Sequence, residues 1–487
     1  MSSKSYFNKV VILLLLSVVA FGGLKAVLPE RLFPERVLTG NNMIVDSMLI
    51  DAINESEMAD ADIVAVPNVD TEQIAAKVDS LHAANIVEVA NDDTLNPLIR
   101  DEGYVHLSRF YTKLKQIEES GSGRARVAYF GDSMNDGDLI VQDIRDYLQN
   151  KFGGKGVGFV GMTSMSAGAR YSVAHQYSKN WQIYSFITTR RPVRPFGVDG
   201  QVTLAKDSTN TYWVKYESHK LKNTGYLYNA TLFYGRSDNA DASISVKAND
   251  DVIEKALKPS DMLNAVKLTG SDTRSLQVTF SNADSIPFYG FNFDDGKGVH
   301  VDNFSLRGNS GLPLSTLNNG LMNRFNSMLG GYDLIVLHYG ANVLSQETKA
   351  YNWYEKGMTH VVENLRRCFP DADILVISTA DKASKVDQEM VTDPAVSLLL
   401  NSQRSYARKT GSGFINLYSL MGGEGSMVKW VDDELAGKDY THFNANGSKR
   451  IAKLIYGEIE KGYQKFKENI PQHNTNIIHE DEGNNDL

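Results

Sequence analysis

Short apolar runs and helix-like repeats alternate along much of the chain. Four apolar runs are typical of strands buried in a parallel sheet: 127–130, 334–337, 373–378 and 414–417. Apolar positions at helical spacing predict helices near 107–117, 139–152, 353–369, 395–409 and 447–466. Because strands alternate with helices, we expect an α/β fold, a doubly wound parallel sheet with helices on both faces.

The middle of the chain breaks this rhythm. From 171 to 305 the sequence is rich in aromatic and β-branched residues, which alternate with polar ones at 211–216 and 243–246. Turn signals at 198–200 and 294–296 punctuate the segment. This pattern predicts an all-β sandwich inserted into the α/β domain, which is thereby split into the parts 107–170 and 306–470.

The N-terminus carries a candidate membrane segment. Lys4 and Lys9 precede an apolar stretch from Val10 to Leu24, and Pro29 follows soon after. We interpret residues 1–28 as an uncleaved signal anchor with the catalytic body outside the cytoplasm; a cleaved signal peptide is the alternative. Residues 29–106 form an acidic spacer in this interpretation, and the polar tail 471–487 is predicted to be disordered.

Composition excludes several classes of protein. The chain has 487 residues and a formal net charge of −9, and no basic block stands out, which argues against a nucleic-acid partner. The single cysteine, Cys368, excludes internal disulfides, and a buried structural thiol is its expected role. No histidine cluster has metal-ligand spacing, so we expect neither a metal nor a cofactor.

A candidate nucleophile follows the first apolar run. Ser133 ends the tripeptide Gly131-Asp132-Ser133, with a predicted strand before it and a predicted helix after it. Such tripeptides often mark ordinary turns. At this position, however, the hydroxyl would stand at the carboxyl end of a strand, where α/β sheets bind their ligands.

A candidate base and its orienting carboxylate lie far downstream. His442 follows Asp439 by three residues, just before the predicted helix at 447–466. His442 would take the proton of Ser133, and Asp439 would orient the imidazole and stabilise its charge. The alternative is that Asp439 and His442 serve only as helix caps.

Two further segments supply candidate oxyanion donors. Asn342, in Gly340-Ala341-Asn342, follows the run at 334–337, and its side-chain amide can donate to an oxyanion. Gly308 follows the β insert, where a glycine lets its backbone N–H approach a substrate closely. With the N–H of Ser133 these donors would form an oxyanion hole, each stabilising the transition state by about 3 kcal/mol.

These segments together resemble the four blocks of the SGNH (GDSL-type) hydrolase family. In that family the first block supplies a serine nucleophile, which corresponds to Ser133. The second and third supply a glycine and an asparagine as oxyanion donors, which correspond to Gly308 and Asn342. The fourth supplies an Asp-His pair, which corresponds to Asp439 and His442. An insert between the first two blocks resembles the arrangement in peptidoglycan O-acetylesterases and the related O-acetyltransferases, in which it resembles a carbohydrate-binding module. One departure is Met134, where many relatives of this subgroup carry histidine.

The resemblance implies a serine esterase that removes O-acetyl groups from an envelope glycan such as peptidoglycan, through an acetyl-enzyme. Two alternatives stay open: a glycan O-acetyltransferase that uses the same residues and a membrane acetyl-donor partner, and a non-catalytic, membrane-tethered glycan-binding protein.

Several residues of the predicted insert have two possible roles. The aromatic residues of the insert can stack on sugar rings or fill its core: Trp181, Tyr212, Trp213, Tyr216, Tyr234 and Tyr289. Asp294-Asp295-Gly296 can ligate calcium or form a β-turn, and His338 is expected to pack in the core.

Overall fold

The computed structural model describes residues 48–49, 52–53 and 106–469, except 220–221, 271–272 and 347. The predicted anchor (1–28) and the predicted tail (471–487) lie outside the described residues, as does most of the predicted spacer (29–106). One described residue of that spacer, Leu49, is buried and belongs to an apolar cluster that includes side chains of the α/β domain. No helix in the described part of the chain is both long and apolar enough to cross a bilayer.

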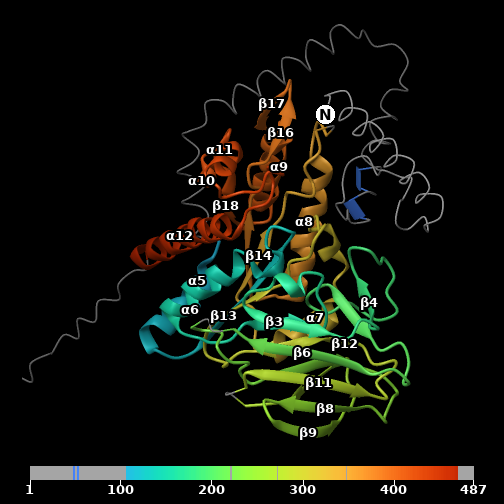
Figure 1. The fold of residues 1–487 in the computed structure, drawn as a ribbon. Helices are drawn as coiled ribbons and strands as arrows, with labels where there is room; N and C mark the ends of the chain where they lie inside the picture. Colours follow the sequence, from blue (N-terminus) through green and yellow to red (C-terminus); the bar gives the residue numbers. More distant parts are fainter. Residues whose placement is uncertain are drawn as a thin grey trace, which may run out of the picture. The chain divides into compact units, whose positions relative to one another are not determined.

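A five-stranded parallel sheet forms the centre of the α/β domain, with the strand order β13-β1-β14-β15-β18 (Figure 1). The bounds are β1 (Arg124–Gly131), β13 (Gly298–Asn303), β14 (Leu334–His338), β15 (Asp373–Ile377) and β18 (Gly413–Ile415). Numbered along the chain, this order is 2-1-3-4-5, one of the common doubly wound arrangements. The predicted fold class of this domain is therefore confirmed.

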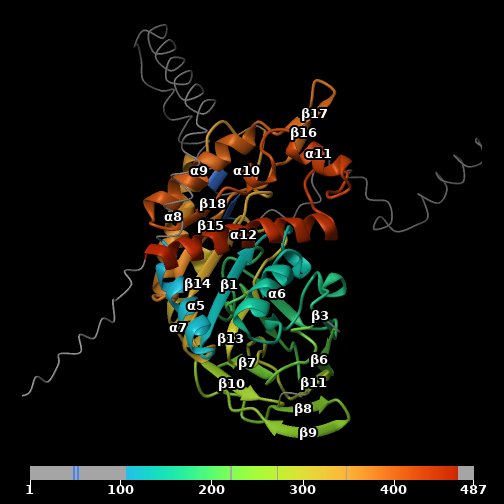
Figure 2. The same cartoon turned by 90° about the vertical axis from the view of Figure 1, so that its left-hand side faces the viewer.

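Helices cover both faces of this sheet because side chains alternate along each strand. In β1, Ala128 and Phe130 pack into one apolar cluster, whereas Val127 and Tyr129 pack into another on the opposite face. The first cluster includes residues of α7 (Asn319–Met328), α8 (Asn352–Cys368) and α9 (Ala395–Lys409). The second includes residues of α5 (Ser108–Ser120), α6 (Val141–Phe152) and α12 (Ala445–Asn469), which lie together in Figure 2.

Two antiparallel sheets form the insert, and their inner faces share a third apolar cluster. One sheet has the order β10-β7-β12-β5-β4 with β2 also paired to β12, and the other has the order β3-β6-β11-β8-β9. Their bounds are β2 (Gly158–Gly161), β3 (Val173–Tyr177), β4 (Gln182–Ser185), β5 (Gln201–Leu204), β6 (Tyr212–Ser218), β7 (Thr231–Gly235), β8 (Ser243–Ala248), β9 (Asp251–Ala256), β10 (Leu263–Lys267), β11 (Ser275–Ser281) and β12 (Phe288–Phe293).

The insert begins and ends earlier than the predicted range 171–305. At its start, β2 already pairs with β12 of the sandwich. At its end, β13 belongs to the parallel sheet, where Val301 pairs with Val127 of β1. The sequence pattern did not place β13 in the parallel sheet, because His300 and Asp302 are polar yet wholly buried. Their alternation with apolar residues is typical of a strand with one solvent-exposed face.

Most of the aromatic residues considered for sugar binding are buried, four of them in the core of the insert and Tyr289 in the cluster shared with the α/β domain. Five of those considered for sugar binding are less than a tenth exposed: Trp181, Tyr212, Tyr216, Tyr234 and Tyr289. Trp213 alone of this group is half-buried. The core interpretation therefore holds for the five, which have no face available for a sugar ring.

Several short elements lie outside the sequence expectation. They are η2 (Asp136–Asp138), η3 (Ala167–Ala169), η4 (Leu312–Thr316), the hairpin of β16 (Ala383–Val386) and β17 (Glu389–Thr392), α10 (Leu417–Met421) and α11 (Ser426–Asp432). Cys368, the last residue of α8, is buried, as expected for a structural thiol.

Candidate active site

Ser133 and His442 meet although 309 positions separate them in the sequence. Ser133 Oγ lies 2.9 Å from His442 Nε2, and His442 Nδ1 lies 2.8 Å from Asp439 Oδ2. Ser133 follows the carboxyl end of β1, and the other two residues form the turn before α12. The three side chains therefore make a continuous chain of hydrogen bonds from carboxylate to imidazole to hydroxyl.

The turn holds the Asp439 carboxylate in a fixed orientation. Its Oδ1 accepts hydrogen bonds from the backbone N–H groups of Thr441 (3.1 Å) and His442 (3.0 Å), so Oδ2 faces the imidazole. Tyr440 adopts a φ of +52°, in the left-handed region, to close this turn. Partial burial raises the pKa of Asp439, but the hydrogen bonds from His442 and Thr441 outweigh it and hold the pKa below its ordinary value. The carboxylate therefore stays ionised near neutral pH.

The alternative of a simple helix cap does not fit the geometry. Helix α12 begins at Ala445, and the residue before it supplies the cap: Asn444 Oδ1 accepts a hydrogen bond from Gly447 N (3.0 Å). The carboxylate of Asp439 bonds instead to His442 and Thr441 within the turn.

Asp132 connects the nucleophile segment to the segment that carries Asn342. Its side chain is buried and accepts a hydrogen bond from Met134 N (2.9 Å). Backbone N–H groups of Ala341 and Gly340 also bond to it. Burial raises the pKa of Asp132 to about 6, although these hydrogen bonds and the charge of His442 pull it down. Ser133 is thus held beside the loop that follows β14.

The two candidate oxyanion donors lie on adjoining loops. Asn342 Nδ2 donates to the backbone oxygen of Asn309 (3.2 Å), the residue after Gly308. Gly308 has a φ of +78°, a left-handed conformation that glycine adopts without strain. Gly340 is needed for a different reason, because a Cβ there would lie 2.4 Å from Cβ of Thr379. The amide of Asn342 has a second N–H, which can donate to an oxyanion.

A carboxylate that sequence reasoning missed joins three segments around the nucleophile. Asp136 Oδ2 accepts from Arg307 Nε (2.6 Å), next to Gly308, and Oδ1 accepts from the hydroxyl of Ser166 in the insert. The local sequence pattern gives no signal that Asp136 contacts Ser166 and Arg307, because both lie far from it along the chain.

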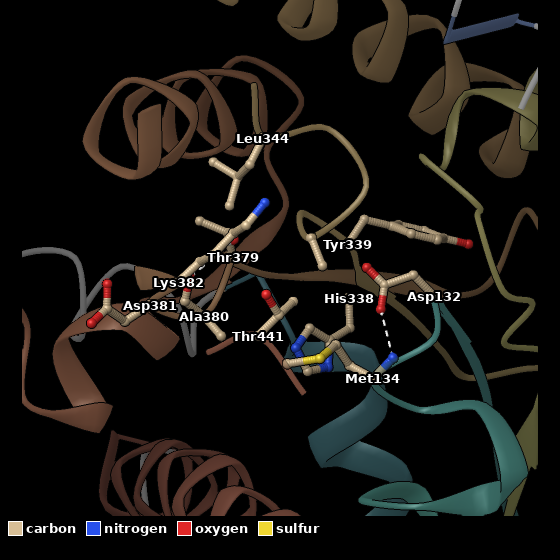
Figure 3. A pocket seen from close by; sticks show the side chains of 11 residues that line it. Asp132, Met134, His338, Tyr339, Leu344, Thr379, Ala380, Asp381, Lys382 and Thr441 are labelled. Atoms are coloured by element: carbon tan, nitrogen blue, oxygen red, sulfur yellow. Dashed lines mark hydrogen bonds between the residues drawn. The ribbon is translucent and has the colours of Figure 1, made fainter. Parts of the chain in front are cut away.

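A pocket lies beside the nucleophile, at the carboxyl ends of β1, β14 and β15 (Figure 3). Asp132, Met134 and Thr441, the sequence neighbours of Ser133 and His442, line it. Its other lining residues are His338, Tyr339, Ala341, Leu344 and the segment Thr379, Ala380, Asp381 and Lys382. The last segment was also missed, although its position directly after an apolar run at 373–378 is the signal that could have revealed it.

His338 packs in the core as expected. It is 4% exposed, and its Nδ1 lies 2.8 Å from the hydroxyl of Tyr129. Burial lowers the pKa of His338 to about 3, so the ring is neutral at ordinary pH.

No group of three or more histidine, cysteine or acidic residues in the described part of the chain is arranged to hold a metal ion. The Asp294 carboxylate is engaged by protein groups instead. Its Oδ2 accepts from Arg126 and Asn292, and its Oδ1 from Gly296 N, as in a β-turn.

The protein thus has a doubly wound parallel α/β fold with a Ser-His-Asp hydrogen-bond chain at the carboxyl end of β1. The chain is similar to a solved structure described as "Peptidoglycan O-acetylesterase in action", with a TM-score of 0.62 and 20% identity over 75% of this chain and 99% of that one. This likeness shows that the two share a fold.

Two further solved structures are more distant. An acetyl xylan esterase, AlAXEase, has a TM-score of 0.25 and 17% identity over 33% of this chain and 81% of that one. A family two carbohydrate esterase from Cellvibrio japonicus has a TM-score of 0.25 and 10% identity over 60% of this chain and 98% of that one. No protein-family model and no curated protein sequence matches the chain.

Proposed function

We propose that this protein is a serine esterase that removes O-acetyl groups from an envelope glycan such as peptidoglycan, with Ser133, His442 and Asp439 as its catalytic residues. The observation that carries the proposal is the hydrogen-bond chain from Asp439 through His442 to Ser133. The fold shared with a peptidoglycan O-acetylesterase supports the class of substrate. Such a substrate would require the catalytic body to lie in the cell envelope.

The first half of the reaction forms an acetyl-enzyme. His442 Nε2, 2.9 Å from the hydroxyl, takes the proton of Ser133 as Oγ attacks the carbonyl carbon of the acetyl ester. The ionised Asp439 stabilises the imidazolium that results. The carbonyl oxygen becomes an oxyanion, which the N–H groups of Ser133, Gly308 and Asn342 would bind. The bond to the sugar oxygen then breaks, and His442 returns the proton to that oxygen.

The second half releases acetate. His442 removes a proton from a water molecule, which attacks the carbonyl carbon of acetyl-Ser133. The tetrahedral intermediate collapses, the bond to Oγ breaks, and Oγ regains a proton from His442. If a glycan hydroxyl replaces this water, the same residues perform an acetyl transfer.

The test measures turnover and locates the nucleophile. Purified protein is incubated with p-nitrophenyl acetate, with and without a sugar acceptor, and is separately labelled with a serine-directed reagent whose site is found by mass spectrometry. Hydrolysis without acceptor and a label on Ser133 would support the esterase. Product formation that requires the acceptor would identify a transferase. Absence of turnover and of labelling would overturn both and favour a binding protein.

Asn342→Ala tests the oxyanion hole. We expect kcat to fall by roughly 100-fold or more, because one donor to the oxyanion is lost in the transition state, with little change in KM. The matched control is Asn323→Ala on α7, whose amide donates to the backbone oxygen of Cys368 (2.7 Å) away from the site. The control should keep the wild-type kcat. Unaltered kinetics in Asn342→Ala would remove that residue from the mechanism.

A further inference from the structure

Two large apolar side chains protrude from one loop of the insert. Met165 is 78% exposed and Tyr171 is 64% exposed, the two highest values among the large apolar residues of the described chain. Both belong to the connection between β2 and β3, which contains η3. A single exposed apolar side chain is ordinary on a protein surface, so what these two residues can bind depends on where their loop lies.

The loop is attached to the segment that follows the nucleophile. The hydroxyl of Ser166 donates to the carboxylate of Asp136 in η2. Arg170 Nη2 lies 3.7 Å from Asp138 Oδ2, at the other end of η2, and both side chains are mostly buried. Both contacts lie between the exposed residues in sequence, one directly after Met165 and the other directly before Tyr171.

The same loop is also held from the side of the sandwich. Tyr177, in β3, donates its hydroxyl hydrogen to the backbone oxygen of Ser164 (2.9 Å). His175 Nε2 lies 3.1 Å from the backbone oxygen of Met162. Because polar contacts fix the loop on both sides, the loop has a defined position relative to the nucleophile segment.

This position is close to Ser133. Asp136 is three residues after Ser133, and three peptide units span at most about 11 Å between Cα atoms. Arg307, next to Gly308, contacts the same carboxylate from the other side (2.6 Å). The insert loop therefore stands within the length of a short oligosaccharide from the reactive hydroxyl.

We propose that Met165 and Tyr171 form a sugar-binding subsite beside the nucleophile. A pyranose ring of the glycan packs its apolar C–H face on the Tyr171 ring, and the adaptable thioether of Met165 fills the space next to it. A sugar ring held there keeps the ester of the same or a neighbouring unit within reach of Ser133. This inference rests on the proposed function, and it assigns to the insert a preference for polymeric glycan over small acetyl esters.

The test compares two substrates in wild-type and variant proteins. The measured quantity is the ratio of kcat/KM for O-acetylated peptidoglycan to kcat/KM for p-nitrophenyl acetate. In Tyr171→Ala we expect this ratio to fall by about tenfold, mainly through KM for the polymer, as the loss of one aromatic contact implies. Met165→Ala should lower the ratio by a smaller factor.

The control is Val252→Ala. Val252 is 59% exposed on β9, at the opposite edge of the sheet from β3, and its replacement should leave the ratio at the wild-type value. A wild-type ratio in Tyr171→Ala would overturn the subsite.

A binding measurement separates failure of the subsite from failure of the proposed function. Calorimetry with an N-acetylglucosamine tetramer uses Ser133→Ala and Ser133→Ala/Tyr171→Ala, so no turnover is needed. Binding that weakens about tenfold in the double variant supports the subsite even if wild-type protein hydrolyses neither ester. Equal binding by the two variants, or no binding by either, overturns it.

Discussion

Ser133→Ala and His442→Ala should each lower kcat for p-nitrophenyl acetate by about 10⁴-fold or more, since a serine hydroxyl without its base, or a base without its hydroxyl, cannot form the acetyl-enzyme. Their 2.9 Å contact makes the two residues a single unit. The double variant should therefore lose no more activity than either single variant. Initial rates at saturating substrate give these values, and circular dichroism checks that the fold is intact.

His360→Ala is the matched control for the histidine. This residue lies on α8 and is 62% exposed, and its Nδ1 lies 3.3 Å from the exposed Glu363 carboxylate. We expect its replacement to leave kcat unchanged. Wild-type turnover in either Ser133→Ala or His442→Ala, with an intact fold, would show that the assigned nucleophile or base is wrong.

The residues of the hydrogen-bond chain could be proposed from the sequence because each lies in a short segment with a local signature. An apolar strand precedes Ser133 and a helix follows it, and the Asp439 carboxylate bonds to His442 only three positions away. What could not be predicted is the contact between these segments, because it depends on how the whole sheet is wound. The connection of Asp136 to Arg307 and Ser166 was missed for the same reason.

The fold was predictable where side chains follow the rule of apolar inside and polar outside. The strands β14 and β15 were located closely because four of the five residues in each are apolar and buried. β13 was assigned to the insert because it contains Asp302 and His300, which are wholly buried. A buried carboxylate needs a partner that a single sequence does not reveal.

That partner is Arg126, the third residue of β1. Its side chain is 0% exposed, and its Nε lies 2.6 Å from Asp302 Oδ2 while its Nη1 lies 2.6 Å from Asp294 Oδ2. Its Nη2 also donates to Asn292 Oδ1 (2.7 Å). Tyr332 donates its hydroxyl hydrogen to Asp302 (2.6 Å). One guanidinium thus connects the central sheet to the last strand of the insert and to the turn after it.

Arg126→Met should lower the free energy of unfolding by about 3–5 kcal/mol, because it leaves two carboxylates buried without their cation. Arg126→Lys keeps the charge but not the forked donor geometry, so we expect an intermediate loss. Urea unfolding followed by tryptophan fluorescence measures both. The exposed pair of Lys429 and Asp433 provides the control, since Lys429→Met should cost less than about 1 kcal/mol.

The pH dependence of the stability lost in Arg126→Met shows whether Arg126 stabilises the fold through its charge or through its packing. Burial raises the pKa of Asp294, but Arg126 outweighs it and holds the pKa well below its ordinary value. A carboxyl whose folded pKa is depressed stabilises the fold above its unfolded pKa of about 3.9, and this contribution is lost as the pH falls through the folded value.

In Arg126→Met the two buried carboxyls can instead become protonated, which removes the penalty of an unpaired charge. The difference between wild type and Arg126→Met should therefore shrink as the pH is lowered from 7 towards about 4. A difference that stays constant over this range would mean that Arg126 stabilises the fold by packing alone.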